Sequence, residues 1–153
     1  MLSFIVPAYN EELELAATIA AIRDAAEDRP PSAKTTAGRQ YEIIVVDDAS
    51  TDATAQVARD AGAQVVSISR RQIAAARNAG ARVARGEVLF FVDADTRING
   101  EHVAGALASL NAGYAGGSAR VLVDGAVPLW GRVFVKTFCT LYFAARLGAG
   151  AFL

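Results

Sequence analysis

The sequence predicts an α/β fold in which a mostly parallel sheet carries helices on both of its faces. Short apolar segments alternate along the chain with segments whose apolar residues recur at helical spacing, the pattern of repeated strand–helix units. The short segments are apolar at consecutive positions, as expected for strands that are covered on both faces. With 153 residues, the chain has the size of a single domain, and we assign residues 1–153 to one.

Composition excludes several classes of protein. Hydrophobic residues make up 53% of the chain and charged residues 20%, which is ample for a core. The net charge of -1 provides no basic field, so we expect no nucleic-acid partner. Cys139 is the only cysteine, which rules out a disulfide framework or a Cys-rich zinc site. No stretch of about 18 uncharged apolar residues is present, and we expect a cytoplasmic protein.

Residues at the start of the chain predict a first strand followed by a helix. We expect a strand at 2–6 that ends at Pro7, because proline lacks a backbone N–H. Asn10 is the expected cap of a helix, with Glu11 and Glu12 in the first turn, where the helix dipole favours acids. One apolar face of this helix carries Leu15, Ile19, Ile22 and Ala26.

The remaining elements follow in alternation. Turn residues and caps bound each of them, with Ser50 or Thr51 as the cap of the second helix and Gly62 as its stop. The expected elements are a polar loop at 28–40, strands at 41–46, 64–68, 87–92 and 119–123, and helices at 50–62, 72–84, 101–110 and 129–147.

Polar residues follow three of these strands, at the point where each strand ends. They are residues 7–11, the pair Asp47 and Asp48, and residues 93–95. Right-handed crossovers bring the carboxyl ends of parallel strands to one edge, where open α/β sheets bind ligands. We therefore expect these three groups to meet at one crevice.

The Asp93-Ala94-Asp95 motif predicts a metal site. Its two carboxylates leave the buried strand one residue apart. Such hard oxygen ligands suit Mg²⁺ or Mn²⁺, which proteins often hold with one or two carboxylates plus substrate phosphates. The alternative is a polar strand end with two solvated acids. No glycine-rich G-x-G-x-x-G or G-x-x-x-x-G-K-[ST] motif is present, which disfavours an ordinary dinucleotide fold and a P-loop NTPase.

Four segments, in this order, resemble the inverting family 2 glycosyltransferases, which have a Rossmann-like GT-A fold. They read FIVPAYNEE at 4–12, IIVVDDASTD at 43–52, ARNAG at 76–80 and GEVLFFVDAD at 86–95. The resemblance covers about residues 2–125. It implies a nucleotide-diphosphosugar donor, a divalent Mn²⁺ or Mg²⁺ ion bound at the DXD motif, and transfer of one sugar with inversion to a saccharide or lipid-linked acceptor. UDP is the commoner nucleotide in the family and is favoured over GDP.

The resemblance also implies roles for individual residues. The residues matched to donor binding are Pro7, Ala8, Tyr9, Glu11, Asp47, Arg77, Asn78, Asp93, Ala94 and Asp95. Asp47 matches an acid that bonds the base or ribose, whereas its neighbour Asp48 could equally cap the next helix. Two roles remain open for Arg77: a contact with the donor, or a position on a solvated helix face. Asp93 and Asp95 match the metal ligands.

The general base is not assigned. The family supplies an acid from a later segment, and the last acid here, Asp124, comes too early. We therefore expect a donor-binding portion truncated before the acceptor half. The alternative is a non-catalytic nucleotide-sugar-binding module. A nucleotidyltransferase is less favoured, because residues 7–12 are neither glycine-rich nor basic. His102, the sole histidine, is expected at the surface.

Two further features stay open. Arg97 stands where some relatives have a third metal ligand; it could pair with a phosphate or point to solvent. Residues 129–147 form a basic, aromatic and apolar helix that could contact the inner face of a membrane peripherally. Packing of this helix on the sheet or on a following domain is the favoured alternative.

Overall fold

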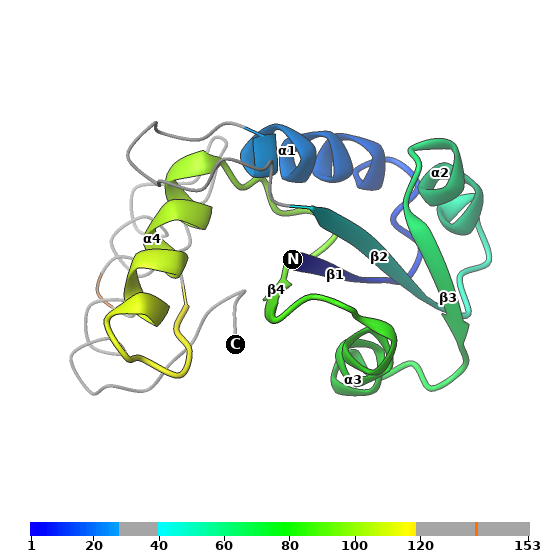
Figure 1. The fold of residues 1–153 in the computed structure, drawn as a ribbon. Coiled ribbons are helices and arrows are strands. Elements are labelled where there is room, and N and C mark those ends of the chain that lie inside the picture. The colour runs from blue at the N-terminus through cyan, green and yellow to red at the C-terminus, as the bar shows by residue number, and fades with distance from the viewer. Residues whose placement is uncertain (28–39, 119–136, 138–153) are drawn as a thin grey trace.

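A computed structural model describes residues 1–27, 40–118 and 137 (Figure 1). The expected strand at 119–123, the helix at 129–147 apart from residue 137, Asp124 and nearly all of the loop at 28–40 lie outside these residues. Every other predicted strand and helix is present. The elements are β1 (Leu2–Ala8), α1 (Leu15–Glu27), β2 (Tyr41–Asp48), α2 (Thr54–Asp60), β3 (Gln64–Ile68), α3 (Ile73–Val83), β4 (Val88–Phe91) and α4 (Gly100–Asn111).

The described strands form one parallel sheet in the order β3-β2-β1-β4. Strand β1 pairs with β2 from Leu2 opposite Tyr41 to Ala8 opposite Asp47. On its other side β1 pairs with β4, with Ile5 opposite Phe91 at the last position. The predicted parallel α/β sheet is therefore confirmed, and the carboxyl ends of its strands share one edge.

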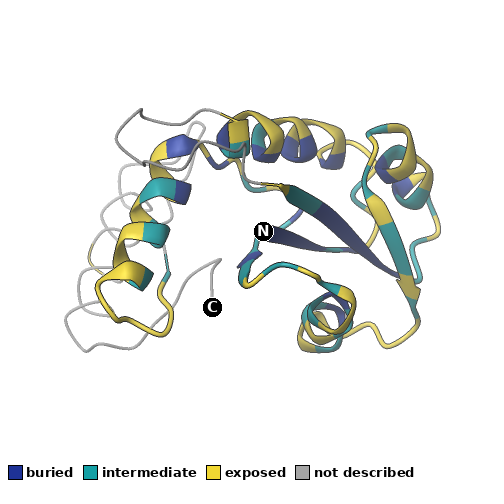
Figure 2. Cartoon of the chain, viewed as in Figure 1, coloured by how far each residue is buried: buried dark blue, intermediate teal, exposed yellow. Residues whose placement is uncertain are grey.

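Helices cover both faces of the sheet, which explains why the strands are apolar at consecutive positions. In β1, Phe4 and Val6 pack in the cluster that contains the buried residues of α1. Ile5, between them, packs in a second cluster with Ala76 of α3. Figure 1 shows α1 and α2 on one face and α3 on the other. Figure 2 shows β1 and most of β2 buried between these layers.

Pro7 does not end the first strand, contrary to the prediction. β1 continues to Ala8, and Pro7 pairs with Val46 of β2. The backbone of Ile5 faces β4, where its carbonyl accepts a hydrogen bond from Val92 N at 3.0 Å. Alternation along the strand turns Pro7 toward this same side, beyond the last paired position of β4. The missing N–H of Pro7 therefore costs no ladder hydrogen bond.

Two predicted helix caps are wrong. Asn10 does not cap α1, because Leu15 N already donates to Glu11 O at 3.0 Å and the helix is assigned from Leu15. Helix α2 begins after Ala53, later than a cap at Ser50 or Thr51 would allow. Carboxylates serve its first turn instead: Asp52 accepts from Thr54 N at 3.0 Å and Glu12 accepts from Ala53 N at 2.9 Å. The expected stop at Gly62 is confirmed by its φ of 75°.

None of the helices within the described part of the chain is long and apolar enough to cross a membrane.

Gly80 lets α3 approach the sheet closely. A Cβ at this position would lie 2.4 Å from Ile5 Cγ2 and 3.1 Å from Val46 Cγ2. Both of these side chains are fully buried, so they have little room to yield. Ala76, one turn earlier, packs in the same cluster. This close contact holds α3, the helix that carries Arg77, against strands β1 and β2.

Asp48 ties the end of β2 to the start of α3. Its Oδ1 accepts a hydrogen bond from Arg70 N at 2.6 Å, and its Oδ2 accepts one from Gln72 N at 2.8 Å. Burial acts to raise the pKa of Asp48, but the backbone donors of residues 70–72 and the Arg71 charge outweigh it and hold the pKa below its ordinary value of 3.8. The alternative that Asp48 caps the next helix, α2, is wrong, because its carboxylate instead accepts from Gln72 N at the N-terminus of α3.

We expect Gly80→Ala and Gly105→Ala to change stability in opposite directions. Overpacking against the sheet should cost Gly80→Ala about 1–3 kcal/mol, more than the helix-propensity gain of up to about 1 kcal/mol. A methyl group added at Gly105, in α4, would meet nothing within 4 Å, so this variant receives only the gain. Urea unfolding of both variants measures the difference. Equal stabilisation by the two substitutions would show that α3 can move away from the sheet.

We expect Asp48→Asn to destabilise the fold by about 1–3 kcal/mol near neutral pH, because one part-buried N–H loses its acceptor. A carboxyl pKa lowered by folding contributes stability above its ordinary value of 3.8. This contribution is lost as the pH falls through the folded-state pKa. The gap between the native protein and the variant, measured by urea unfolding from pH 7 to pH 3, should therefore be constant at high pH and narrow below about pH 4. A gap independent of pH would contradict the assignment.

Candidate functional site

The carboxyl ends of β1, β2 and β3 each lead into a residue with a left-handed backbone. Asn10 has a φ of 55°, Ala49 a φ of 61° and Arg71 a φ of 47°. Among the described residues these are the only non-glycine positions with positive φ. Such conformations persist where surrounding contacts hold them, and they concentrate at functional sites. All three lie at the edge where the sequence predicts a crevice.

Hydrogen bonds join the loop after β1 to the loop after β2. Asn10 N donates to Ser50 Oγ at 3.0 Å, and Asn10 Oδ1 accepts from Thr51 N at 2.8 Å. Glu11 N donates to Thr54 Oγ1 at 2.8 Å. These bonds pair the polar groups of the turn at Asn10 and hold residues 7–11 beside the end of β2.

Asp47 and Asp48 are adjacent in β2 but project to opposite faces of the sheet. Both are buried, at 7% and 4% exposure. Asp48 uses both carboxylate oxygens in the α3 cap. Asp47 Oδ1 accepts only from Ser50 N, at 3.2 Å, and its Oδ2 accepts no hydrogen bond from the described residues. Asp47 is therefore the acid of the pair with an oxygen available to a ligand.

Tyr9 and Arg71 stack beside this pair of acids. The guanidinium carbon of Arg71 lies 4.7 Å from the centroid of the Tyr9 ring, a cation–π contact. Tyr9 is 40% exposed, and Arg71 is exposed as well. An exposed aromatic ring with a guanidinium over it offers a flat surface suited to stacking a nucleobase.

Arg77 of α3 pairs with Asp93 at the end of β4. Arg77 Nη2 donates to Asp93 Oδ1 at 2.9 Å, and the side chains are 20% and 35% exposed. Arg77 Nε is buried and has no partner among the described residues. Of the two readings of Arg77, the structure supports a place in the crevice rather than a solvated helix face.

The Asp93-Ala94-Asp95 motif forms a tight turn after β4. Thr96 N donates to Asp93 O at 2.9 Å and closes the turn. Ala94 is 4% exposed and packs into the core with Val92 and Ile98. Asp95 is exposed, and its one contact within residues 40–118 is a long bond from Thr96 Oγ1 at 3.5 Å. The buried alanine thus anchors the turn, while Asp95 remains available to a cation.

Glu11 shows that the loop after β1 and the Asp93-Ala94-Asp95 turn share one electrostatic environment. Burial raises the pKa of Glu11, and the negative charges of Asp95, Asp52 and Glu14 raise it further. A bound cation would offset this concentration of negative charge. The negative charge of Asp95 therefore acts on the Glu11 carboxyl.

The donor set fits a hard divalent cation that shares its coordination with a ligand. No cluster of three or more Asp, Glu, His or Cys side chains that could hold a metal occurs in the described residues. Asp93 and Asp95 would therefore supply at most two protein ligands. Mg²⁺ is commonly bound in this way, by one or two carboxylates with phosphates and water completing the shell.

Arg97 does not extend freely into solvent, because it is held by two side chains of helix α1. Its Nη2 donates to Glu14 Oε2 at 2.7 Å, and its Nη1 donates to Thr18 Oγ1. Thr18 in turn donates to the carbonyl of Ala94, at 2.5 Å. Sequence reasoning missed Thr18, Glu14 and Arg71. For Thr18 a signal existed, because a hydroxyl on the apolar face of α1 requires a partner.

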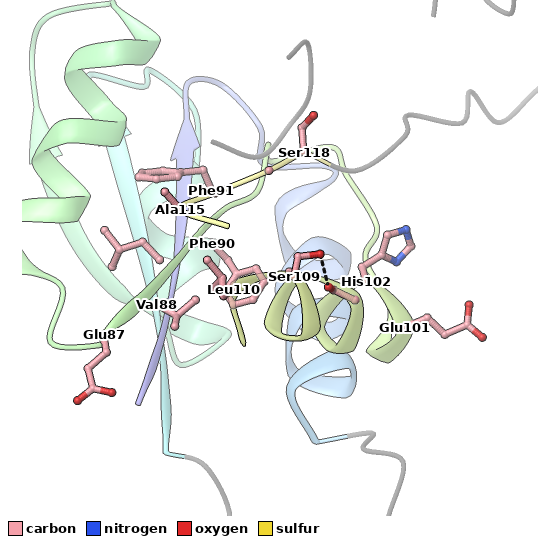
Figure 3. Close-up of a pocket in the computed structure, with 15 residues that line it drawn as sticks. Glu87, Val88, Phe90, Phe91, Glu101, His102, Ser109, Leu110, Ala115 and Ser118 are labelled. Atoms are coloured by element: carbon pink, nitrogen blue, oxygen red, sulfur yellow. Dashed lines mark hydrogen bonds between the residues drawn. The ribbon is translucent and has the colours of Figure 1, made fainter. Parts of the chain in front are cut away.

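Some residues lie apart from the crevice. Asn78 is exposed on α3 and, among the described residues, joins none of these contacts. His102 is exposed, as predicted, and forms a capping box with Asn99 at the start of α4. A cavity of about 770 Å³ lies between β4 and α4 (Figure 3). Its lining includes Val88, Phe91 and Leu110 but none of the predicted site residues.

Known proteins with similar sequences are sugar transferases. The chain is 30% identical over 115 residues to validoxylamine A glucosyltransferase from Streptomyces hygroscopicus subsp. limoneus. It is 31% identical over 108 residues to 4,4'-diaponeurosporenoate glycosyltransferase from Staphylococcus haemolyticus. A third relative, 29% identical over 102 residues, is undecaprenyl-phosphate 4-deoxy-4-formamido-L-arabinose transferase from Aeromonas hydrophila. These alignments cover 71%, 66% and 62% of the chain but only 23%, 26% and 29% of the relatives.

Solved structures of glycosyltransferases share the fold. A mannosyltransferase from Pyrobaculum calidifontis, in complex with GDP-Man and Mn²⁺, superposes with a TM-score of 0.64 at 27% identity over 78% of the chain. S. aureus TarS 1-349, in complex with UDP-GlcNAc, superposes with a TM-score of 0.58 at 29% identity over 83% of the chain. The chain covers 35% and 36% of these structures. The expected GT-A fold is confirmed.

The family model "Glycosyl transferase family 2" matches residues 3–138. This match includes the strand ends, the Arg77 helix and the Asp93–Asp95 turn that build the crevice. The chain belongs to glycosyl transferase family 2.

Proposed function

We propose that this chain forms the nucleotide-diphosphosugar site of a glycosyltransferase that transfers one sugar, with inversion, in a reaction that depends on a divalent cation. The observation that carries the proposal is that two acids lie at one edge of a parallel sheet: Asp47, whose Oδ2 accepts no hydrogen bond from the described residues, and the exposed Asp95. The names of the relatives support transfer of a sugar. Because the chain spans about a third or less of these relatives, the activity of the whole protein is part of the proposal.

The nucleoside binds where the loops after β1 and β2 meet. Pro7 and Ala8 carry the end of β1 to this point, and the exposed Tyr9 ring offers a stacking surface there. Asp47 Oδ2 accepts a hydrogen bond from the base or from a ribose hydroxyl. A carboxylate that is 7% exposed makes a strong bond of this kind, because little water competes with the ligand. GDP-Man and UDP-GlcNAc each occur in a similar structure, so neither base is preferred.

The diphosphate binds next to the turn after β4. Asp95 and Asp93 hold the cation there, and Arg77, already paired with Asp93, lies within reach of the same charges. A bound cation acts as a Lewis acid that stabilises the charge developing on the leaving nucleoside diphosphate. Without charge neutralisation of this kind, the diphosphate is a poor leaving group.

The acceptor is proposed as a saccharide or a lipid-linked molecule. One relative is named for transfer of an aminoarabinose derivative to undecaprenyl phosphate, a lipid-linked acceptor. Inversion requires a general base that deprotonates the acceptor hydroxyl. We assign no residue to this role within residues 1–27 and 40–118. If donor binding occurs without acceptor-dependent release of nucleoside diphosphate, the chain acts as a binding module.

We expect Mn²⁺ or Mg²⁺ to strengthen the binding of nucleoside diphosphates to this chain. Asp95→Ala should reduce this strengthening by at least about tenfold, since even outer-shell partners of a metal contribute 10–100-fold. Isothermal titration of UDP and GDP, with Mn²⁺ or with EDTA, measures the effect. Asp24→Ala removes an exposed acid from α1 and serves as the charge-matched control. Equal affinity with Mn²⁺ and EDTA in the native chain would reject the metal dependence.

We expect Asp47→Ala to weaken nucleoside diphosphate binding by about 1.5–3 kcal/mol, the range for a hydrogen bond to a charged group. Folding should remain nearly intact, because Asp47 accepts only one bond from the described chain. Asp48→Ala is the matched variant, and it should lose stability through the α3 cap. Titration and urea unfolding of both variants separate the roles. A stable Asp48→Ala that binds poorly, beside an unfolded Asp47→Ala, would show that the two acids are assigned the wrong way round.

A further inference from the structure

We infer that Thr18 and Arg97 are positioning residues that set the orientation of the Asp93-Ala94-Asp95 turn for metal-dependent donor binding. They act through the Ala94 carbonyl and do not contact the ligand. This inference rests on the proposed function, because it assigns a task to residues behind the proposed metal site.

Thr18 connects helix α1 to the middle of the metal motif. It lies on the inner face of α1 and is fully buried. Its Oγ1 donates to Ala94 O at 2.5 Å, across a separation of 76 residues in the chain. Ala94 is the residue between the two acids, so its carbonyl belongs to the peptide unit that leads into Asp95. A bond to this oxygen restrains the backbone from which the Asp95 carboxylate extends.

Arg97 strengthens the hydrogen bond that the Thr18 hydroxyl donates. A hydroxyl has one hydrogen, and two carbonyls compete for it: Ala94 O at 2.5 Å and Glu14 O at 3.3 Å. Arg97 Nη1 donates to the same Oγ1. A charged donor at the oxygen polarises the O–H group and strengthens the bond that it donates. The three groups therefore form a directed chain from the Arg97 guanidinium to the Ala94 carbonyl.

The charge of Arg97 is paired with an acid of helix α1. Its Nη2 pairs with Glu14 at 2.7 Å, and the two side chains are 40% and 55% exposed. The guanidinium thus lies between an acid on the surface of α1 and a buried hydroxyl of the same helix. Two donors fix it in this place, which is a geometry that the guanidinium fork permits and a lysine ammonium does not reproduce. Arg97 therefore ties the turn to α1 through two side chains of that helix.

Packing of α1 does not by itself account for Thr18. The neighbouring inner positions Leu15, Ile19 and Ile22 are fully buried apolar side chains in the core cluster. A buried hydroxyl among them is costly unless it is hydrogen-bonded. The Thr18 hydroxyl is hydrogen-bonded to the carbonyl of Ala94, in the turn that carries Asp93 and Asp95. The buried hydroxyl therefore restrains the turn that orients these two carboxylates.

The test compares the affinity for UDP and GDP in Mn²⁺ with the affinity in EDTA, for each variant. Thr18→Val preserves the shape of the side chain and removes the hydroxyl, whereas Thr18→Ser keeps the hydroxyl. We expect Thr18→Val to reduce the ratio of the two affinities about tenfold, the scale of outer-shell effects on metal binding. The metal-free affinity should stay unchanged, and Thr18→Ser should keep most of the ratio. General damage to the fold would instead lower both affinities.

Arg97→Met tests the relay without altering the core. Its control is Arg85→Met, which removes another arginine that pairs with an acid, Glu42 at 3.0 Å, near the opposite ends of the strands. We expect the ratio of the affinity in Mn²⁺ to the affinity in EDTA to fall only for Arg97→Met. If Thr18→Val does not fold, this pair of arginine variants decides the inference. Equal ratios for Arg97→Met and Arg85→Met would then overturn it.

The remaining outcomes separate the inference from the proposed function. If Asp95→Ala loses the Mn²⁺ effect and Thr18→Val keeps it, the relay is rejected and the metal site stands. If Thr18→Ser reduces the ratio of the two affinities as much as Thr18→Val does, packing at this position matters and the hydroxyl does not. That result also overturns the inference. If the native chain itself shows no Mn²⁺ effect, the proposed metal dependence fails and the inference fails with it.

Discussion

The two central strands of the parallel sheet, β1 and β2, are covered on both faces, so the polar residues that follow them emerge at the ends of the strands. The interior positions of β1 and β2 are buried almost without exception, because α1 and α2 pack on one face and α3 on the other. Since the strands are parallel, their carboxyl ends share an edge. The residues that follow β1, β2 and β4 therefore meet there, although up to about 80 residues separate them in the chain.

Because side chains alternate along β2, its two neighbouring aspartates, Asp47 and Asp48, have different surroundings. Asp48 faces α3 and is saturated by backbone N–H groups at the start of that helix. Asp47 faces the side of α1 and α2, where it accepts one bond from Ser50 and keeps an oxygen free. A shift of one residue in the register of β2 would exchange these roles. The pairing of Ala8 with Asp47 therefore determines which acid is presented to a ligand.

Hydrogen bonds between distant loops hold the crevice in shape, where the core cannot reach. Asn10 and Glu11 are tied to the loop after β2, and Thr18 is tied to the turn after β4. Each bond satisfies a polar group that the strand ends would otherwise leave unpaired. The left-handed residues at these ends are compatible with this view, because local strain persists where several contacts fix the backbone. The proposed donor site thus depends on polar contacts between elements as much as on the sheet.

Local pattern in the sequence determined the element order, the parallel sheet and the candidate acids at its edge. Periodicity and turn residues identify strands and helices, and the crossover rule then places the strand ends together. Only the tertiary structure decided that Asn10 bonds the next loop instead of capping α1, that Asp48 caps α3, and that Arg97 reaches Thr18. A hydrogen bond between residues far apart in the chain leaves no periodic signal, because its geometry exists only after the sheet has assembled. Sequence by itself therefore indicated which strand ends carry the candidate acids, and the folded chain decided which of these acids keep an oxygen without a partner among the described residues.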